Sequence, residues 1–530
     1  MKITIDHITV EVSPGTTILQ AARSMGLEIP ALCYLDGHSN HPSCFVCLVE
    51  EEDSGRLVPS CAMSAEEGMA ILTDSPAAVT ARKEALELLL SEHVGDCEAP
   101  CQRSCPAGMN IPLMNRLIST GKLHEALSVV REEIALPLVL GYICPAPCEK
   151  ACRRKAIDAP VQICMLKRFT AQDKEIRYHG LNPNRTMSGK RIAVIGTGPA
   201  GLAAAFHSLR LGHEVVLFEK ADLPGGALRY AIPDDLLPKD KLDADIEVIR
   251  WMGGHFELKT HVNKNFFENK ILNGFHGVIL ATGFTEEHPA DDFSLVPVAK
   301  NLLVDRKLMT TSRPGVFGCG SLISEQLLSV RSVDQGKKAA FSAHYFMMGT
   351  TSGKIHPGVC SVMPVPNEEE LSEYLKESSA DHVVDPAGGY LTGYTAEEAS
   401  REARRCLHCD CRKPVSCKLR KYAAEYEADR RRYLGPERKR MIRQVQHDLV
   451  IWEPEKCIKC GLCVSITKVN QEPLGLAFVR RGFDVGINVP FGESLQAGLT
   501  IAARECVAAC PTGALALKDM EENLDNIEQK

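Results

Sequence analysis

The side chains best suited to chemistry in this sequence are its cysteines, of which 530 residues contain 22. They stand in tight groups beside proline or glycine, and thiolates at short, repeated spacings are the ligands of iron–sulfur clusters. A disulfide framework is the alternative interpretation. It is disfavoured because the N-terminus, MKITIDHITV, lacks a basic-then-apolar secretion signal. We therefore expect a cytoplasmic, reducing location, in which thiols stay available for metal.

The first group has the spacing C-x10-C-x2-C-x13-C and consists of Cys33, Cys44, Cys47 and Cys61. Ahead of it, alternating apolar residues on either side of Asp6 and His7 predict a β-hairpin, and residues 17–25 predict a helix that ends at Gly26. These elements predict a β-grasp ferredoxin domain over residues 1–80 with a [2Fe-2S] centre. The pattern resembles the N-terminal domain of the iron–sulfur subunit of NADH dehydrogenase (complex I) and of [FeFe]-hydrogenases.

The second group begins with His93 and Cys97, where those families start a [4Fe-4S] site. The segments that follow, CEAPCQRSCPAGMNIP and CPAPCEKAC, are instead similar to the paired-cluster domain of the glutamate synthase small subunit. This resemblance implies a helical domain over residues 81–185 with two [4Fe-4S] clusters and interleaved ligands. One implied set is His93, Cys97, Cys101 and Cys152. The other is Cys105, Cys144, Cys148 and a fourth group.

The fourth ligand of the second set departs from the family pattern. The family places Gln or Glu seven residues after a proline, and the matching residue after Pro160 is Lys167, a cation that cannot bind iron. Residues 161–170 predict a helix, and positions three apart share a helix face. We therefore predict that Cys164, one turn before Lys167, replaces the missing ligand.

A third group packs four cysteines into the segment ARRCLHCDCRKPVSC, namely Cys406, Cys409, Cys411 and Cys417. Four thiolates at such short spacing suit either a [4Fe-4S] cluster or a tetrahedral structural zinc site. We predict the cluster, because the rest of the chain is built for electron transfer. Residues 396–445 are assigned to this Cys-rich segment.

The last module, residues 446–530, resembles one half of a two-cluster bacterial ferredoxin, with the cysteines Cys457, Cys460, Cys463 and Cys510. The ligand positions of the other half fall on Thr467, Thr500, Ala503 and Cys506, which leave a single thiolate. One [4Fe-4S] cluster is therefore predicted here, with Cys506 a buried hydrophobe. Cys319 and Cys360 are also predicted to be unligated.

Between the cysteine groups, residues 190–220 predict a dinucleotide site. An apolar run leads into Gly196-Thr197-Gly198-Pro199-Ala200-Gly201 and then into an alanine-rich helix. Gly196 permits the tight turn, Gly198 lets a pyrophosphate approach the backbone, and Gly201 lets the helix pack closely on its strand. Glu219 ends the next strand, where a carboxylate can accept hydrogen bonds from a ribose.

Further motifs follow in order, in residues 224–233, 237–239, 278–283 and 314–320. They resemble the flavin domain of the glutamate synthase small subunit and of dihydropyrimidine dehydrogenase. The resemblance implies a Rossmann-like domain over residues 186–350 that binds FAD through Gly196, Gly198, Pro199, Ala200, Glu219, Gly226, Leu228, Thr282, Gly283, Gly320 and Ser321. The chain departs from that family in two places. Only residues 284–312 stand where the family has an NADPH-binding domain, and Ser321 stands where it usually has an acid.

Composition narrows the possible functions. A net charge of −7 argues against general nucleic-acid binding, and no apolar run is long enough to span a membrane. Residues 401–440 nevertheless hold fourteen Lys and Arg against six Asp and Glu, as a solvated helix face or a docking surface for an acidic partner would. Residues 351–395 are predicted to be a linker. The predicted fold class is multidomain, with α/β and α+β parts.

A flavin exchanges two electrons while each cluster carries one. A chain with FAD, one [2Fe-2S] and up to four [4Fe-4S] clusters is therefore suited to electron transfer. We predict an electron-transfer subunit of a hetero-oligomeric complex, similar to subunits of electron-bifurcating complexes. The resemblances imply an NADH-oxidising flavin subunit, ferredoxin and a hydrogenase- or formate-dehydrogenase-like catalytic subunit as partners. The alternatives are a self-sufficient NAD(P)H-dependent reductase and a scaffold with an inactive flavin site. No catalytic acid, base or nucleophile is predicted.

Overall fold

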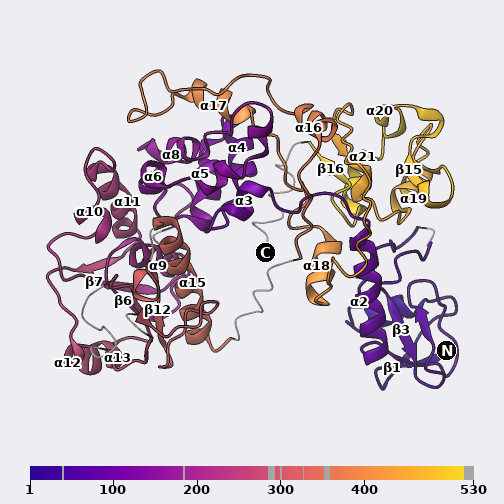
Figure 1. The fold of residues 1–530 in the computed structure, drawn as a ribbon. Coiled ribbons are helices and arrows are strands. Elements are labelled where there is room, and N and C mark those ends of the chain that lie inside the picture. Colours follow the sequence, from indigo (N-terminus) through magenta and orange to yellow (C-terminus); the bar gives the residue numbers. More distant parts are fainter. Residues whose placement is uncertain are drawn as a thin grey trace. The chain divides into compact units, whose positions relative to one another are not determined.

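The computed structural model describes residues 1–38, 41–182, 186–284, 293–298, 301–325, 328–350 and 359–518. The chain forms two compact units, each built from separate stretches of sequence (Figure 1). Unit 1 comprises Met1–Glu98, Ile355–Glu377 and Cys409–Lys530, and unit 2 comprises Ala99–Lys354 and Ser378–His408. The chain is thus a mixed α/β multidomain protein, as predicted.

The N-terminal part of unit 1 is a five-stranded mixed sheet with the strand order β2-β1-β5-β3-β4, in which β1 and β5 run parallel. The predicted hairpin is confirmed, since β1 pairs antiparallel with β2 and the turn residues Asp6 and His7 both have positive φ. The predicted helix is confirmed too, because the Thr17 hydroxyl accepts a hydrogen bond from the Gln20 amide at 3.2 Å and caps α1. The elements are β1 (Lys2–Ile5), β2 (Ile8–Glu11), α1 (Ile18–Ser24), β3 (Leu48–Glu51), β4 (Leu57–Pro59), β5 (Ala70–Leu72) and α2 (Pro76–Ser91).

The remainder of unit 1 is made of short elements joined by loops. Strand β13 pairs antiparallel with β16, and β14 with β15. Helices α19 and α21 pack on each other, and α21 also packs on β16. The elements are α16 (Glu368–Leu375), α18 (Lys418–Glu425), β13 (Val450–Trp452), η4 (Pro454–Lys456), α19 (Leu462–Val469), β14 (Ala477–Val479), η5 (Gly482–Asp484), β15 (Gly486–Asn488), η6 (Pro490–Gly492), α20 (Leu495–Gly498), α21 (Ala503–Ala509) and β16 (Leu515–Leu517).

The helical part of unit 2 carries the second cysteine group. The helix predicted over residues 161–170 is present as α8, and α8 packs against α6. The approach is close, because a Cβ at Gly141 would lie 2.5 Å from the Cβ of Arg168. The elements are α3 (Pro100–Ser104), α4 (Ile111–Ser119), α5 (Leu123–Glu133), α6 (Pro137–Ile143), α7 (Pro147–Lys150), η1 (Arg153–Ala156), α8 (Ile163–Gln172) and, from later in the chain, α17 (Ala396–Arg404).

The rest of unit 2 is built on a parallel sheet with the strand order β12-β9-β6-β7-β8. In chain order this is 3-2-1-4-5, the doubly wound arrangement. Helices α9 and α15 lie beside this sheet (Figure 1). The elements are β6 (Arg191–Ile195), α9 (Pro199–Arg210), β7 (Glu214–Phe218), α10 (Ala227–Tyr230), α11 (Lys239–Trp251), β8 (His255–Glu257), α12 (Lys264–Phe266), η2 (Phe267–Ile271), α13 (Leu272–Gly274), β9 (Gly277–Leu280), β10 (Pro297–Val298), β11 (Asn301–Leu302), β12 (Val316–Gly318), η3 (Gly320–Leu322) and α15 (Ser329–Met348).

The described part of the predicted linker is packed. Helix α16 in unit 1 buries Glu370, which accepts two hydrogen bonds from Arg438. In unit 2 the Glu402 carboxylate of α17 accepts the amides of Gln162 and Val384 at 2.9 Å each. Across the described residues, every helix is too short or too polar to cross a lipid bilayer.

Candidate functional site

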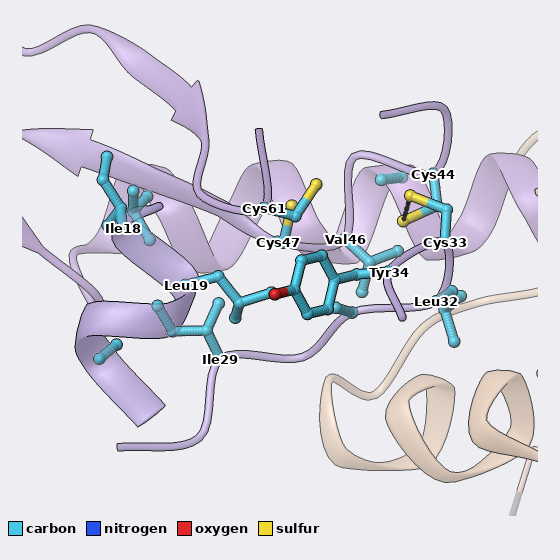
Figure 2. Packing of buried hydrophobic residues seen from close by; sticks show 14 of the residues in the cluster. Ile18, Leu19, Ile29, Leu32, Cys33, Tyr34, Cys44, Val46, Cys47 and Cys61 are labelled. Carbon is cyan, nitrogen blue, oxygen red and sulfur yellow. Dashed lines mark hydrogen bonds between the residues drawn. The ribbon is translucent and has the colours of Figure 1, made fainter. Parts of the chain in front are cut away.

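The four cysteines of the first group meet beside the five-stranded mixed sheet of unit 1. Their side chains are at most 4 % exposed and lie in the same core as Ile18, Leu19 and Val46. Figure 2 shows them as two pairs, Cys33 with Cys44 and Cys47 with Cys61. The Sγ atoms of Cys33 and Cys44 are 3.3 Å apart, and Cys61 contacts both Cys33 and Cys47.

The electrostatic surroundings of Cys33 favour its thiolate form. The hydrogen-bond contacts with the thiols of Cys44 and Cys61 lower the pKa of Cys33, and the same contacts raise the pKa values of Cys44 and Cys61. Backbone amides of Ser43 and Cys44 also donate to Cys33. Four buried thiols in two pairs, with amides facing a sulfur, form a donor set that fits a [2Fe-2S] centre.

Three cysteines of the second group meet where α6, α7 and α8 come together in unit 2. Cys164 on α8 accepts a hydrogen bond from the Cys144 thiol and donates one to Cys148. Burial and the bond to Cys148 outweigh the bond from Cys144 and raise the pKa of Cys164 to about 12. Cys164 thus lies beside Cys144 and Cys148, and its role as the fourth ligand stays a prediction.

Lys167 lies against these three cysteines and also interacts with the sulfur of Cys105. Its side chain is 3 % exposed, and its Nζ donates to the Leu140 carbonyl at 3.1 Å and to Cys164 Sγ at 3.8 Å. Burial by itself lowers the pKa of a lysine, but the sulfurs of Cys164, Cys144, Cys148 and Cys105 outweigh it and raise the pKa of Lys167. A buried positive charge thus faces the four sulfurs, where it would stabilise anionic thiolates or a bound cluster.

The other predicted set is divided between the units. His93 and Cys97 belong to unit 1, whereas Cys101 and Cys152 belong to unit 2. Burial and the neighbouring Lys456 lower the pKa of His93 to about 4, and among the described residues its Nδ1 has no hydrogen-bond partner. Within unit 2, the sulfur of Cys152 interacts with that of Cys406.

The third group is likewise divided, because Cys406 belongs to unit 2 and Cys409, Cys411 and Cys417 belong to unit 1. Within unit 1, Cys411 lies near Cys97 and Cys417. In the described parts of the chain, no three His, Cys, Asp or Glu side chains are placed to hold a single metal ion. The assignment of residues 406–417 to a cluster and not to zinc stays a prediction.

The cysteines of the last module gather as a set in unit 1. All four line one small cavity under β13 and β16, together with Trp452 and Ile487. They are Cys457, Cys460, Cys463 and Cys510. Cys506 is fully buried and its thiol donates to the Cys463 carbonyl at 3.8 Å. Glu472 was missed by sequence reasoning, yet its carboxylate accepts the amides of residues 500–502 and the Thr500 hydroxyl.

The predicted dinucleotide residues all line one cavity of about 490 Å³ in unit 2, at the carboxyl ends of the parallel strands. That end of a doubly wound sheet is where such folds bind ligands. The Oγ1 of Thr282 is buried there without a hydrogen-bond partner. Glu219 is 7 % exposed and accepts the Thr197 amide at 3.0 Å and hydroxyl at 2.6 Å, so it shapes the glycine turn.

The three glycines of the turn differ in their surroundings as their predicted roles require. A Cβ at Gly201 would lie 1.9 Å from the carbonyl oxygen of Gly196, so the helix can approach the turn only without one. Gly196 has a φ of +99° and close backbone neighbours. Gly198, the N-cap of α9, has no atom within 4 Å of a built Cβ. The backbone at the N-terminus of α9 is therefore open to the close approach of a phosphate group.

Comparison with protein-family models identifies three domains in succession. Residues 1–76 match a 2Fe-2S iron–sulfur cluster binding domain, residues 83–178 match dihydropyrimidine dehydrogenase domain II with a 4Fe-4S cluster, and residues 194–245 match an NAD(P)-binding Rossmann-like domain. The chain therefore combines iron–sulfur domains with a Rossmann-like domain. The predicted resemblances are confirmed at this level.

The chain is also similar to curated proteins over about a third of its length. It is 35% identical over 209 residues to the NADP(+)-dependent formate dehydrogenase subunit beta of Moorella thermoacetica, covering 35% of this chain and 29% of that protein. It is 36% identical to the glutamate synthase [NADPH] small chain of Mycobacterium tuberculosis, covering 36% and 39%. It is 32% identical to the NAD-dependent dihydropyrimidine dehydrogenase subunit PreT of Salmonella typhimurium, covering 40% and 51%. The chain thus spans about half or less of the length of these relatives.

Proposed function

We propose that this chain is an iron–sulfur flavoprotein that carries electrons as one subunit of a larger oxidoreductase. The observation that carries the proposal is the coexistence of a single cavity lined by all the predicted dinucleotide residues with several groups of facing thiols. FAD bound in the cavity would supply two-electron chemistry, and the clusters would divide the pair into single electrons. The chain's own residues position the dinucleotide and hold the clusters apart from water.

The proposed partners follow from the relatives. Two of them are named as subunits, of a formate dehydrogenase and of a dihydropyrimidine dehydrogenase. We propose that this chain links NADH or ferredoxin to a hydrogenase- or formate-dehydrogenase-like catalytic subunit, with an NADH-oxidising flavin subunit alongside. The proposed ligands are those predicted for the [2Fe-2S] centre and the last module, and in unit 2 the set Cys105, Cys144, Cys148 and Cys164. Cys101 and Cys152, kept from the predicted set, are proposed ligands of a second unit 2 cluster, and we add Cys406 because its sulfur interacts with that of Cys152.

The test is a chemical inventory of the chain purified without oxygen. Flavin at about one per chain, one [2Fe-2S] signal and up to four [4Fe-4S] signals are expected from EPR, iron and sulfide analysis. A chain that takes up neither flavin nor iron under reconstitution would overturn the proposal.

A second candidate function is a self-sufficient NAD(P)H-dependent reductase. The observation in its favour is that the model matching residues 194–245 is described as NAD(P)-binding. In that case the same cavity would receive the nicotinamide dinucleotide. Rapid bleaching of the isolated chain's visible absorption by NADH or NADPH would favour the reductase, and no bleaching would favour the subunit.

A further inference from the structure

Four cysteines of unit 1 come together although no sequence motif groups all four. Cys97 follows α2, Cys360 precedes α16, and Cys411 and Cys417 precede α18. The Cys97 thiol donates a hydrogen bond to Cys360, and the sulfur of Cys411 interacts with those of Cys97 and Cys417. Backbone bonds hold the segments in place, since Cys411 N donates to the Cys97 carbonyl at 3.3 Å and Cys97 N to the Ser361 carbonyl at 3.0 Å.

The surroundings of these sulfurs favour anionic thiolates. The Ser361 amide donates to Cys97 Sγ at 3.2 Å, and the Arg420 amide donates to Cys417 Sγ at 3.4 Å. The guanidinium of Arg420 interacts with Cys97 and Cys360, and the buried ammonium of Lys456 interacts with Cys411. Amide donors and fixed cations beside sulfur are the means by which proteins stabilise bound iron–sulfur clusters.

Gly513 gives an independent sign that the chain is shaped around Cys411. A Cβ at position 513 would lie 2.2 Å from Cys411 Sγ, far inside van der Waals contact. Apart from its own chain neighbours, the next atoms of the described residues, Cys411 Cβ and Lys456 Cδ, would lie 3.9 Å from that point. The glycine therefore leaves room for the sulfur of a residue about a hundred positions earlier in the chain.

We propose that Cys97, Cys360, Cys411 and Cys417 bind a [4Fe-4S] cluster in unit 1. The four thiols need not converge on one point, because a cubane binds each thiolate to a different iron. Cys417 interacts with Cys510 of the last module, and Cys460 of that module interacts with Cys33. The proposed cluster therefore adjoins the last module's cysteines, which adjoin the [2Fe-2S] cysteines, and the three sets form a relay. This inference rests on the proposed electron-transfer function.

The test uses the full chain, reconstituted without oxygen, and compares Cys360→Ser with Ser361→Ala. Cys360→Ser is expected to lose about four irons per chain, or to show a three-iron cluster by EPR, because one ligand is gone. Ser361→Ala keeps the backbone amide that faces Cys97 and should keep the iron of the wild type. Cys411→Ser should lose the same signal as Cys360→Ser, and the [2Fe-2S] signal reports that unit 1 is still folded.

A second measurement needs no variant. Alkylation of the wild type, mapped by mass spectrometry, should leave Cys360 unmodified until iron is chelated, although its side chain is partly exposed. The proposal is overturned if Cys360 is alkylated in the iron-loaded chain, if Cys360→Ser holds the iron of Ser361→Ala, if zinc and not iron is lost, or if Cys97 and Cys360 form a disulfide. A wild type without any iron would instead overturn the proposed function.

Discussion

Lys167 offers a prediction whose size can be worked out from the structure. Its Nζ lies 3.8 Å from Cys164 Sγ and donates to the Leu140 carbonyl, so the ammonium is fixed beside the proposed cluster of Cys105, Cys144, Cys148 and Cys164. Lys167→Gln removes the positive charge and keeps a donor. An electron added to the cluster then gains less stabilisation, so the reduction potential of that cluster should fall.

The magnitude follows from Coulomb's law. The electron is spread over the cluster, so its mean distance from Nζ is larger than 3.8 Å. At a distance of roughly 7 Å and an effective dielectric constant of about 20, unit charges interact by about 2.4 kcal/mol. For a one-electron couple this corresponds to about 100 mV, since about 59 mV accompanies each tenfold change in the equilibrium constant.

The assay is an EPR-monitored redox titration of wild type and Lys167→Gln, with iron content measured on the same samples. One [4Fe-4S] signal should move to lower potential, and the [2Fe-2S] signal is the internal control because its cysteines lie in unit 1. Unchanged potentials in a variant that keeps all its iron would show that no cluster lies beside Lys167. The assignment of Cys164 would then fail with it.

The remaining predictions concern single residues. Cys164→Ser should destroy or convert one [4Fe-4S] cluster and leave the [2Fe-2S] spectrum intact; iron analysis and EPR check this, and an unchanged cluster count would contradict it. Gly198→Val should abolish flavin binding, because its side chain would fill the open space above the α9 N-terminus; full flavin content in the variant would refute the site. Glu472→Gln should lower the stability of the last module by about 1–3 kcal/mol, since the carboxylate accepts three amides and a hydroxyl; the onset of urea unfolding measures it, and Glu493→Gln, an exposed site in the same module, should show no such shift. Burial raises the pKa of Asp245 to about 7, so its contribution to stability is full below about pH 4, the ordinary range of an aspartate, and is lost as the pH rises through the folded value; urea unfolding at several pH values should show this loss in the wild type and not in Asp245→Asn.

The elements fixed by local chemistry were predictable from the sequence. The hairpin at Asp6 and His7 and the capped helix after Thr17 depend on residues only a few positions apart. The glycine turn at 196–201 is local too, because each glycine's role follows from the strand and helix that flank it. Its surroundings in the structure, such as the open space at Gly198, agree with those roles.

The sets of cysteines that meet in the structure were harder to predict, because a spacing gives only distances along the chain. The neighbours of Cys97 and Cys411 come from residues hundreds of positions apart, and no pattern in one sequence pairs them. Cys164 could be proposed as a ligand because the helix predicted to carry it is regular, so that a ligand position could be moved by one turn. Cys360 stands in an irregular segment, where no periodicity applies.

The third group shows how a buried charge network can fix one cysteine of a closely spaced set. Cys406 directly follows α17, and that helix is held in unit 2 by buried charges. Arg405 is fully buried and donates to Glu402 at 2.6 Å and to Asp158 at 3.1 Å. Removing one partner of such a network would leave a buried charge unpaired, which costs several kcal/mol, so the end of α17 cannot move freely. The anchor therefore fixes Cys406 within unit 2, where its sulfur interacts with that of Cys152.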